Sequence, residues 1–143
     1  MIGLPYGQTV ISFDETNAAV LRSRIDELSS SQAGMELVEE AMVRPIGSKS
    51  LRELAKGKRT CTVIISDHTR PVPSRDILPP MIRELRQGNP EIQITLLVAT
   101  GFHRGTTKQE LIAKLGEEIA SNETIVVHDC TDASANVQIG VLP

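Results

Sequence analysis

Short apolar runs alternate with helix-length amphipathic segments in the second half of the chain, and this alternation constrains the fold more than any other feature. The runs span residues 61–65, 92–99 and 125–127. Strand–helix–strand units of this length place neighbouring strands in parallel, joined by crossover connections. The pattern predicts an α/β fold, a Rossmann-like parallel sheet with flanking helices. Because a further extended segment starts at Val137, just before the end, we expect the incomplete N-terminal part of a larger domain.

The two segments between the runs carry helix start and stop signals. The first helix is expected to follow Ser74 and to stop at residues 88–90, whose sequence is Gly-Asn-Pro. Residues 79–80 are both proline, so either the first turn begins near them or the helix bends there. The second helix is expected to open on overlapping capping boxes within residues 106–110, with an apolar stripe that continues to Ile119.

Weaker signals precede residue 60. Residues 8–13 and 18–22 resemble two short strands around a turn. The serines at 29–31 are N-cap candidates for a helix that ends near Val43. Residues 50–53 fit a capping box for a short helix that follows.

Charge and hydropathy argue against several classes of protein. The chain has 15 basic and 18 acidic residues, a formal net charge of −3, and no basic run, which argues against a nucleic-acid binder. No apolar stretch approaches the roughly 18–20 residues that cross a bilayer, and the first 20 residues do not resemble a secretory signal. We therefore expect a cytoplasmic protein that binds neither nucleic acid nor a membrane.

All three histidines of the chain, His68, His103 and His128, come just after one of the apolar runs. The carboxyl ends of parallel strands meet at one edge of a sheet, and ligands of open α/β sheets bind outside that edge. We therefore expect the three histidines to gather at a ligand-binding edge.

The loop after the first run is the richest in chemistry. It contains Asp67, Thr69 and Arg70, followed by prolines that stiffen the backbone. The guanidinium of Arg70 suits a carboxylate or phosphate, Asp67 can accept from a ribose hydroxyl or orient a histidine, and the following helix presents free N–H groups to an anion. The same residue types also occur in loops where they only stabilise the loop itself, so a purely structural role stays open.

The second and third loops each carry a histidine. His103 lies between Gly101 and Gly105 and can transfer a proton near neutral pH, although it can equally well hydrogen-bond its own loop. For His128 and Asp129, which follow the third run, a structural role is the favoured interpretation. The histidines together with Asp129 also suit a zinc or nickel site, but without the tight ligand spacing that indicates one.

The chain carries four short motifs in sequence, at residues 66–71, 97–104, 115–119 and 128–129. Their order resembles the nickel-dependent lactate racemase family, and the resemblance runs from about Pro45 to the end. Members of this family are α/β enzymes that racemise or epimerise 2-hydroxy acids. They carry a nickel-pincer nucleotide, a pyridinium-3,5-bisthiocarboxylic acid mononucleotide that holds nickel, and two histidines alternate as base and acid at the substrate hydroxyl.

Several roles follow from this resemblance. It implies a cofactor-binding segment made of Asp67, His68, Thr69 and Arg70. It implies catalytic roles for His103, as one of the two proton-transferring histidines, and for Arg70, placed near the substrate. The expected substrate is a small 2-hydroxy acid. No residue of this chain is expected to bind the nickel directly.

In this family, the second proton-transferring histidine, the lysine bonded to the cofactor and the histidine that completes nickel coordination lie downstream. We therefore expect residues 1–143 to be the N-terminal part of a lactate racemase-like domain, with a strand pair and a helix in 1–45 and the βαβαβ core with the site loops in 46–143. The remainder of the same chain is the expected partner. Residues 1–143 alone are expected to be inactive and not to retain the cofactor.

Two hypotheses from other functional classes stay open at this point. The first is a non-catalytic α/β module that binds a nucleotide or another phosphorylated ligand through a helix N-terminus and Arg70. The second is a metal-dependent hydrolase whose ligands are His68, His103, His128 and Asp129.

Overall fold

The structure, a computed structural model, describes residues 1–21, 23–28 and 32–141. The chain divides into two compact units, Met1–Ser31 and Gln32–Pro143. The second unit is a mixed α/β structure. Its elements are α1 (Gly34–Val43), α2 (Leu51–Ala55), β3 (Thr60–Ser66), α3 (Ser74–Gly88), β4 (Gln93–Ala99), α4 (Lys108–Leu115), α5 (Glu117–Asn122) and β5 (Thr124–Val127).

The three apolar runs form one parallel sheet in the order β3-β4-β5, as the sequence predicts. The register aligns Ile64 with Leu97, and Leu97 with Val126. Because all three strands run in the same direction, the loops after Ser66 and Val127 leave the sheet at the same edge as the loop after β4. The expected fold class, a Rossmann-like parallel sheet with flanking helices, is confirmed.

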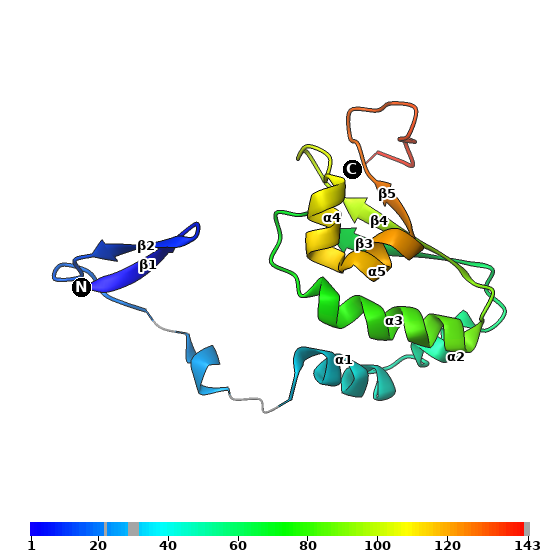
Figure 1. The fold of residues 1–143 in the computed structure, drawn as a ribbon, viewed down its shortest axis with the longest axis horizontal. Helices are drawn as coiled ribbons and strands as arrows, with labels where there is room; N and C mark the ends of the chain where they lie inside the picture. Colours follow the sequence, from blue (N-terminus) through cyan, green and yellow to red (C-terminus); the bar gives the residue numbers. More distant parts are fainter. Residues whose placement is uncertain (22, 29–31, 142–143) are drawn as a thin grey trace. The chain divides into compact units, whose positions relative to one another are not determined.

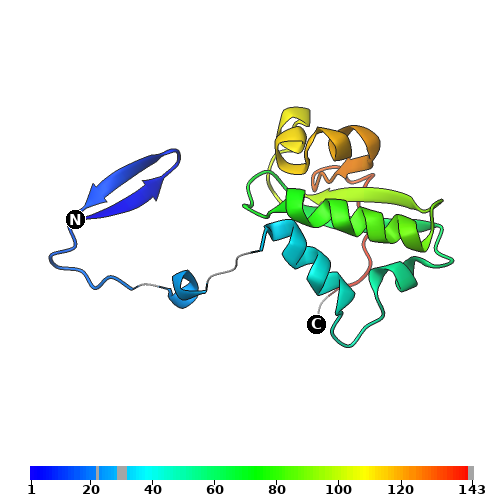
Figure 2. The ribbon, with the colours of Figure 1, turned by 60° about the horizontal axis from the view of Figure 1, so that its bottom comes forward.

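The helices α3, α4 and α5 pack against one face of this sheet (Figures 1 and 2). Alternate strand residues point to opposite faces, and one alternate set enters the core. Leu96 and Val98 of the central strand β4 are completely buried there. The opposite face carries Ile64 and Val126, whose exposed fractions are 70% and 46%. The helix-covered face of the sheet therefore holds the core.

Replacing Leu96 by alanine is expected to lower the free energy of unfolding of the full-length protein by about 2–5 kcal/mol. The side chain has no exposed area and lies between two neighbouring strands, so its removal leaves a cavity. The matched control is Ile64→Ala on the opposite face, for which a loss below about 1 kcal/mol is expected. Urea unfolding followed by circular dichroism measures both. A larger loss for Ile64→Ala than for Leu96→Ala would contradict the assignment of the core.

The helices α3 to α5 decide one alternative that the sequence leaves open and correct one prediction. Helix α3 begins at Ser74 and continues through Pro79 and Pro80, so the first turn does not begin near the prolines. The predicted capping box of Thr107 with Glu110 opens α4. The expected single helix through Ile119 is wrong, because Gly116 adopts a φ of +87°, which is open to glycine, and separates α4 from α5.

Helices α1 and α2 both contact α3 (Figures 1 and 2). The predicted capping box of α2 is confirmed, with Ser50 and Glu53 bonded to each other's backbone N–H groups. Helix α1 begins at Gly34 with Ala33 as its N-cap residue, whose N–H donates to the Glu36 carboxylate at 3.2 Å. The serines at 29–31 are therefore not the cap, and they lie outside the described residues.

The first unit is a two-stranded antiparallel hairpin, β1 (Ile2–Tyr6) and β2 (Thr9–Phe13), followed by the 3₁₀ turn η1 (Arg24–Glu27). The predicted strand at 8–13 corresponds to β2. The predicted partner at 18–22 is wrong, since 18–21 form no strand and residue 22 lies outside the described residues. Gly7, with a φ of +60°, instead allows a tight turn back to β1.

Three further findings concern the chain. Helix α1 belongs to the second unit, while the expected division of a larger domain at residue 45 stays a prediction. The segment expected to extend from Val137 forms no strand over 137–141, and its last two residues lie outside the described part. No helix in residues 1–21, 23–28 and 32–141 is long and apolar enough to span a bilayer.

Candidate functional site at the carboxyl edge of the sheet

Buried polar side chains concentrate at one edge of the molecule. The described residues include four buried polar ones, all in the loops or first turns that follow the carboxyl ends of β3 and β4. They are Asp67, Ser74, Thr100 and Thr106, with exposed fractions of 2%, 4%, 2% and 8%. Buried polar groups are costly unless they are paired, so their partners show what this edge is built to hold. The three histidine-containing loops meet here, as the sequence predicts.

Asp67 and His103 are in direct contact across the loops after β3 and β4. The Nδ1 atom of His103 lies 2.5 Å from Oδ2 of Asp67, whose carboxylate is almost completely buried. The other carboxylate oxygen accepts from the hydroxyl and the N–H of Thr69 at 2.7 and 3.1 Å. The Thr69 hydroxyl, and next the His103 ring, lower the pKa of Asp67 to about 2. Asp67 is therefore a carboxylate at neutral pH.

This ionisation state fixes the proton on the histidine ring. An ionised carboxylate can only accept hydrogen bonds, so Nδ1 of His103 must carry the hydrogen that it donates to Asp67. The neutral ring then has its lone pair on Nε2. The side chain of His103 is about half exposed, at 46%, while Asp67 is buried. The pair therefore presents a basic nitrogen on an oriented ring that ligands can reach.

His68 lies in a second group of interacting side chains. Its Nδ1 is 3.1 Å from the hydroxyl of Thr106, and its Nε2 is 3.7 Å from Glu110. Arg104 binds Glu110 through two hydrogen bonds of 2.6 and 2.9 Å. These bonds, and next the N–H of Thr107, hold the pKa of Glu110 well below its ordinary value. His68 is therefore held by a hydroxyl and a neutralised carboxylate, apart from the Asp67–His103 pair.

His128 is held separately at the end of β5. The buried hydroxyl of Thr100 donates to the backbone carbonyl of His128 at 2.6 Å and lies 3.2 Å from its Nδ1. Its Nε2 is 3.2 Å from the side-chain oxygen of Asn136. The neighbouring Asp129 accepts from Thr131, whose hydroxyl lowers the pKa of Asp129. These bonds within the loop support the structural interpretation of His128 and Asp129.

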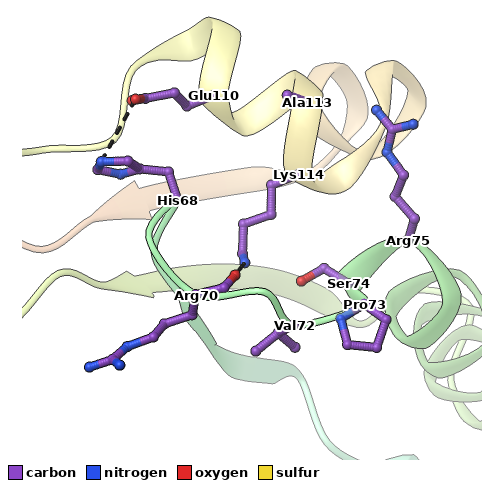
Figure 3. Close-up of a pocket in the computed structure, with 9 residues that line it drawn as sticks. All are labelled: His68, Arg70, Val72, Pro73, Ser74, Arg75, Glu110, Ala113 and Lys114. Carbon is purple, nitrogen blue, oxygen red and sulfur yellow. Dashed lines mark hydrogen bonds and ion pairs between the residues drawn. The ribbon is translucent and has the colours of Figure 1, made fainter. Parts of the chain in front are cut away.

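A cavity of about 440 Å³ opens between the loop after β3, the start of α3, and α4. Figure 3 shows Lys114 extending from α4 to the backbone carbonyl of Arg70, to which it donates at 3.0 Å. The hydroxyl of Ser74 points toward the same space, whereas the guanidinium of Arg70 points away from it (Figure 3). Burial lowers the pKa of Lys114, and the negative charge of Asp67 opposes this shift.

A second hollow of about 540 Å³ lies between the loop after β4 and the end of β5, and His103 is among the residues that line it. Its lining includes Phe102, which is 97% exposed, together with His128 and Cys130. His103 therefore lines the second hollow, whereas His68 lines the first.

The structure does not bring the four residues of the hydrolase hypothesis into one group. His68, His103 and His128 each have different partners. Within the described ranges, no group of three or more His, Cys, Asp or Glu residues is arranged to hold a metal ion. The arrangement gives the hydrolase hypothesis no support.

The parallel sheet, with its histidine-bearing loops at the carboxyl edge, defines an α/β protein. A family model for the lactate racemase N-terminal domain matches residues 6–143, so the chain belongs to this family. It is 43% identical to a lactate racemase of Thermoanaerobacterium thermosaccharolyticum and 47% identical to one of Lactiplantibacillus plantarum, each over 99% of this chain. The solved lactate racemase apoprotein from T. thermosaccharolyticum superimposes with a TM-score of 0.84, at 43% identity and over 99% of this chain.

The chain spans about a third of these relatives, 34% of each curated sequence and 33% of the solved chain. The match to the family model confirms the family that the sequence motifs predict. The roles predicted for Asp67, His68, Thr69, Arg70 and His103 stay predictions, which the geometry above now makes specific.

Sequence reasoning missed two residues that the structure places at this edge, Ser74 and Lys114. Ser74 was assigned only to the start of a helix. Lys114 belongs to no motif, and its bond to a backbone carbonyl leaves no pattern in the sequence. The expectation that helix α3 offers N–H groups to an anion was the one available signal for this part of the site.

Proposed function

We propose that the chain is the N-terminal part of a nickel-pincer-nucleotide-dependent racemase or epimerase of 2-hydroxy acids. Membership of the lactate racemase family supports the class of enzyme. The Asp67–His103 pair is the observation that carries the mechanism, because it orients a basic nitrogen at an edge where α/β proteins bind ligands.

His103 is the proton-transferring group in this proposal. Its Nδ1–H is held by Asp67, so Nε2 takes the proton of the substrate's 2-hydroxyl group and later returns it. The imidazolium that forms stays beside the buried carboxylate, which stabilises its charge. Asp67 therefore acts through His103, as a positioning residue, while its predicted contact with the cofactor stays a prediction.

The residues of this edge fit an anionic nucleotide cofactor. The cavity is lined by Arg75, Lys114 and Ser74, and by Arg70, whose guanidinium points away from it (Figure 3). When bound, the nickel-pincer nucleotide supplies the acceptor for the hydride that leaves the substrate carbon. This chain would contribute contacts to the organic part of the cofactor, through the loop that begins at Asp67.

Arg70 is the residue that we assign to the substrate carboxylate. Its side chain is exposed, and its guanidinium has no hydrogen bond or ion pair within the described part of the chain. A guanidinium binds a carboxylate through two parallel hydrogen bonds, which a lysine cannot reproduce.

Arg70→Lys in the full-length, cofactor-loaded protein is therefore expected to raise KM for the 2-hydroxy acid by about tenfold, with a smaller change in kcat. Steady-state kinetics in both reaction directions measure the effect. The matched control is Arg24→Lys, an exposed arginine of the first unit, which is expected to leave both constants unchanged. An unchanged KM in Arg70→Lys would contradict the assignment.

The experiment that tests the proposal is direct. The full-length, cofactor-loaded protein is incubated with one enantiomer of lactate and of other 2-hydroxy acids, and chiral chromatography follows the appearance of the other enantiomer. We expect conversion toward equal amounts of the two enantiomers. A non-catalytic nucleotide-binding module would bind the nucleotide and leave every enantiomer unchanged, which would refute the proposal.

A further inference from the structure

The hairpin of the first unit has one strongly apolar face. Alternate residues of a strand share a face, so the register of β1 with β2 places five large side chains together: Ile2, Leu4, Tyr6, Ile11 and Phe13. The opposite face carries only one large apolar side chain, in the set Gly3, Pro5, Val10 and Ser12. Antiparallel strands with this alternation normally pack one face against a core and leave the other in water.

The first unit has no core against which this face could pack. None of its described side chains is buried, and four of the five large ones on the apolar face are exposed: Leu4, Tyr6, Ile11 and Phe13. A two-stranded hairpin alone is at best marginally stable in water, and it becomes stable when a third strand or another element covers its apolar face. The hairpin therefore needs a partner that lies outside the first unit.

One edge of the hairpin is open to a further strand. The loop between β1 and β2 has two residues, so the pair that flanks it is hydrogen-bonded and every second pair after it is as well. The N–H groups of Val10 and Ser12 then point outward from β2. On the outer edge of β1, an equivalent position holds Pro5, which has no N–H to donate. The edge of β2 is therefore the one suited to pairing.

The length of the relatives indicates where this partner lies. The chain spans 34% of each lactate racemase that it matches, so about two thirds of such a protein follows the region compared here. The hairpin is part of the shared fold, because the solved relative matches 99% of the chain. In the second unit, the alternate strand residues that face the helices are already packed in its own core.

We propose that the hairpin completes a β-sheet with the segment of the full-length protein that follows residue 143. A strand of that segment pairs with the outer edge of β2, and the apolar face of the hairpin packs against the same segment. This interface ties the first unit to the downstream part of the protein. It rests on membership of the family and not on the proposed function, because it uses no residue of the carboxyl edge.

Photo-crosslinking in the full-length protein tests which segment covers the apolar face. Ile11→p-benzoylphenylalanine places the reactive group on that face, and mass spectrometry identifies the linked peptides. Cross-links to residues beyond 143 of the same molecule are expected. The matched control is the same replacement at Val10, which is expected to give about tenfold fewer of these cross-links because its side chain points to the opposite face.

Hydrogen exchange resolved to single amides tests the strand pairing. In the full-length protein, the amides of Val10 and Ser12 are expected to exchange on the order of 100-fold more slowly than the outward amide of Gly3 on β1. Ile11→Lys is expected to remove this protection, because it places a charge in the interface. Val10→Lys, on the opposite face, is expected to retain it. The cross-linking result keeps the test valid if Ile11→Lys is unstable.

The remaining outcomes would overturn the proposal. Cross-links from position 11 to residues 32–143, cross-links to a second molecule, recognised by the doubled mass, or no cross-links at all would each exclude the downstream segment as the partner. Amides of Val10 and Ser12 that exchange as fast as that of Gly3 would exclude the strand pairing. Neither measurement uses substrate or cofactor, so either result stands whether or not the protein racemises 2-hydroxy acids.

Discussion

His103→Gln in the full-length, cofactor-loaded protein is expected to lower kcat for the interconversion of 2-hydroxy acid enantiomers by about 10²- to 10⁴-fold. The variant removes the nitrogen that takes the hydroxyl proton, and neither His68 nor His128 replaces it, because both are held by other partners. Initial rates from each enantiomer measure the loss. The kcat/KM values of the two directions are expected to fall by the same factor, since a catalyst cannot change the equilibrium constant.

The fold and the cofactor site provide the controls for this variant. His103 is about half exposed, so His103→Gln is expected to unfold at the same urea concentration as the unaltered protein and to bind nicotinic acid mononucleotide equally well. Lys108→Gln, an exposed change at the start of α4, is expected to retain full turnover. Unchanged kcat in His103→Gln would remove the proton-transfer role from this residue.

The sequence was sufficient to predict that this edge exists, because parallel topology alone dictates it. Three apolar runs rich in β-branched residues, separated by helical segments, admit few arrangements other than parallel neighbours. Once β3, β4 and β5 are parallel, Asp67, His103 and His128 must follow strands that end at the same edge. Their proximity needed no knowledge of individual contacts.

Local breaks in the helices and strands could not be predicted in the same way. A helix that continues through Gly116 and a helix that stops there both place Ile119 in the core, and glycine in a helix costs only about 1 kcal/mol. The pattern of apolar residues therefore does not discriminate between them. The partner strand of the hairpin could not be predicted either, because Gly7 and residues 14–17 both suit a turn. In the structure, β2 pairs with β1 through the turn at Gly7.

The partners of individual side chains were also beyond the sequence. Asp67 could equally well have bound a ribose, its own loop or a histidine, and only the fold shows that His103 lies 2.5 Å away. Lys114 reaches the site from a different helix and bonds to a backbone carbonyl, a contact that any residue type can accept. Such long-range contacts depend on packing distances that residue types do not encode.

The importance of the Asp67 contact is tested by Asp67→Asn, which is expected to lower kcat by about 10²- to 10⁴-fold while KM changes little. The amide has nearly the same shape as the carboxylate, but it can donate its own hydrogen to Nδ1 of His103, which moves the ring hydrogen to Nε2 and removes the base. Asp67 remains ionised down to about pH 2, so the carboxylate holds the other tautomer throughout the neutral range.

The ¹⁵N chemical shifts of the His103 ring give the readout that a merely structural role would not alter. In the unaltered protein, the neutral ring is expected to carry its hydrogen on Nδ1, because the buried carboxylate of Asp67 can only accept. In Asp67→Asn, the hydrogen is expected on Nε2. Asp129→Asn, at an exposed carboxylate in the loop after β5, is the matched control and should leave both the tautomer and kcat unchanged. Full activity of Asp67→Asn with an altered tautomer would contradict the proposed mechanism, because Nε2 of His103 would then lack the lone pair that takes the substrate proton.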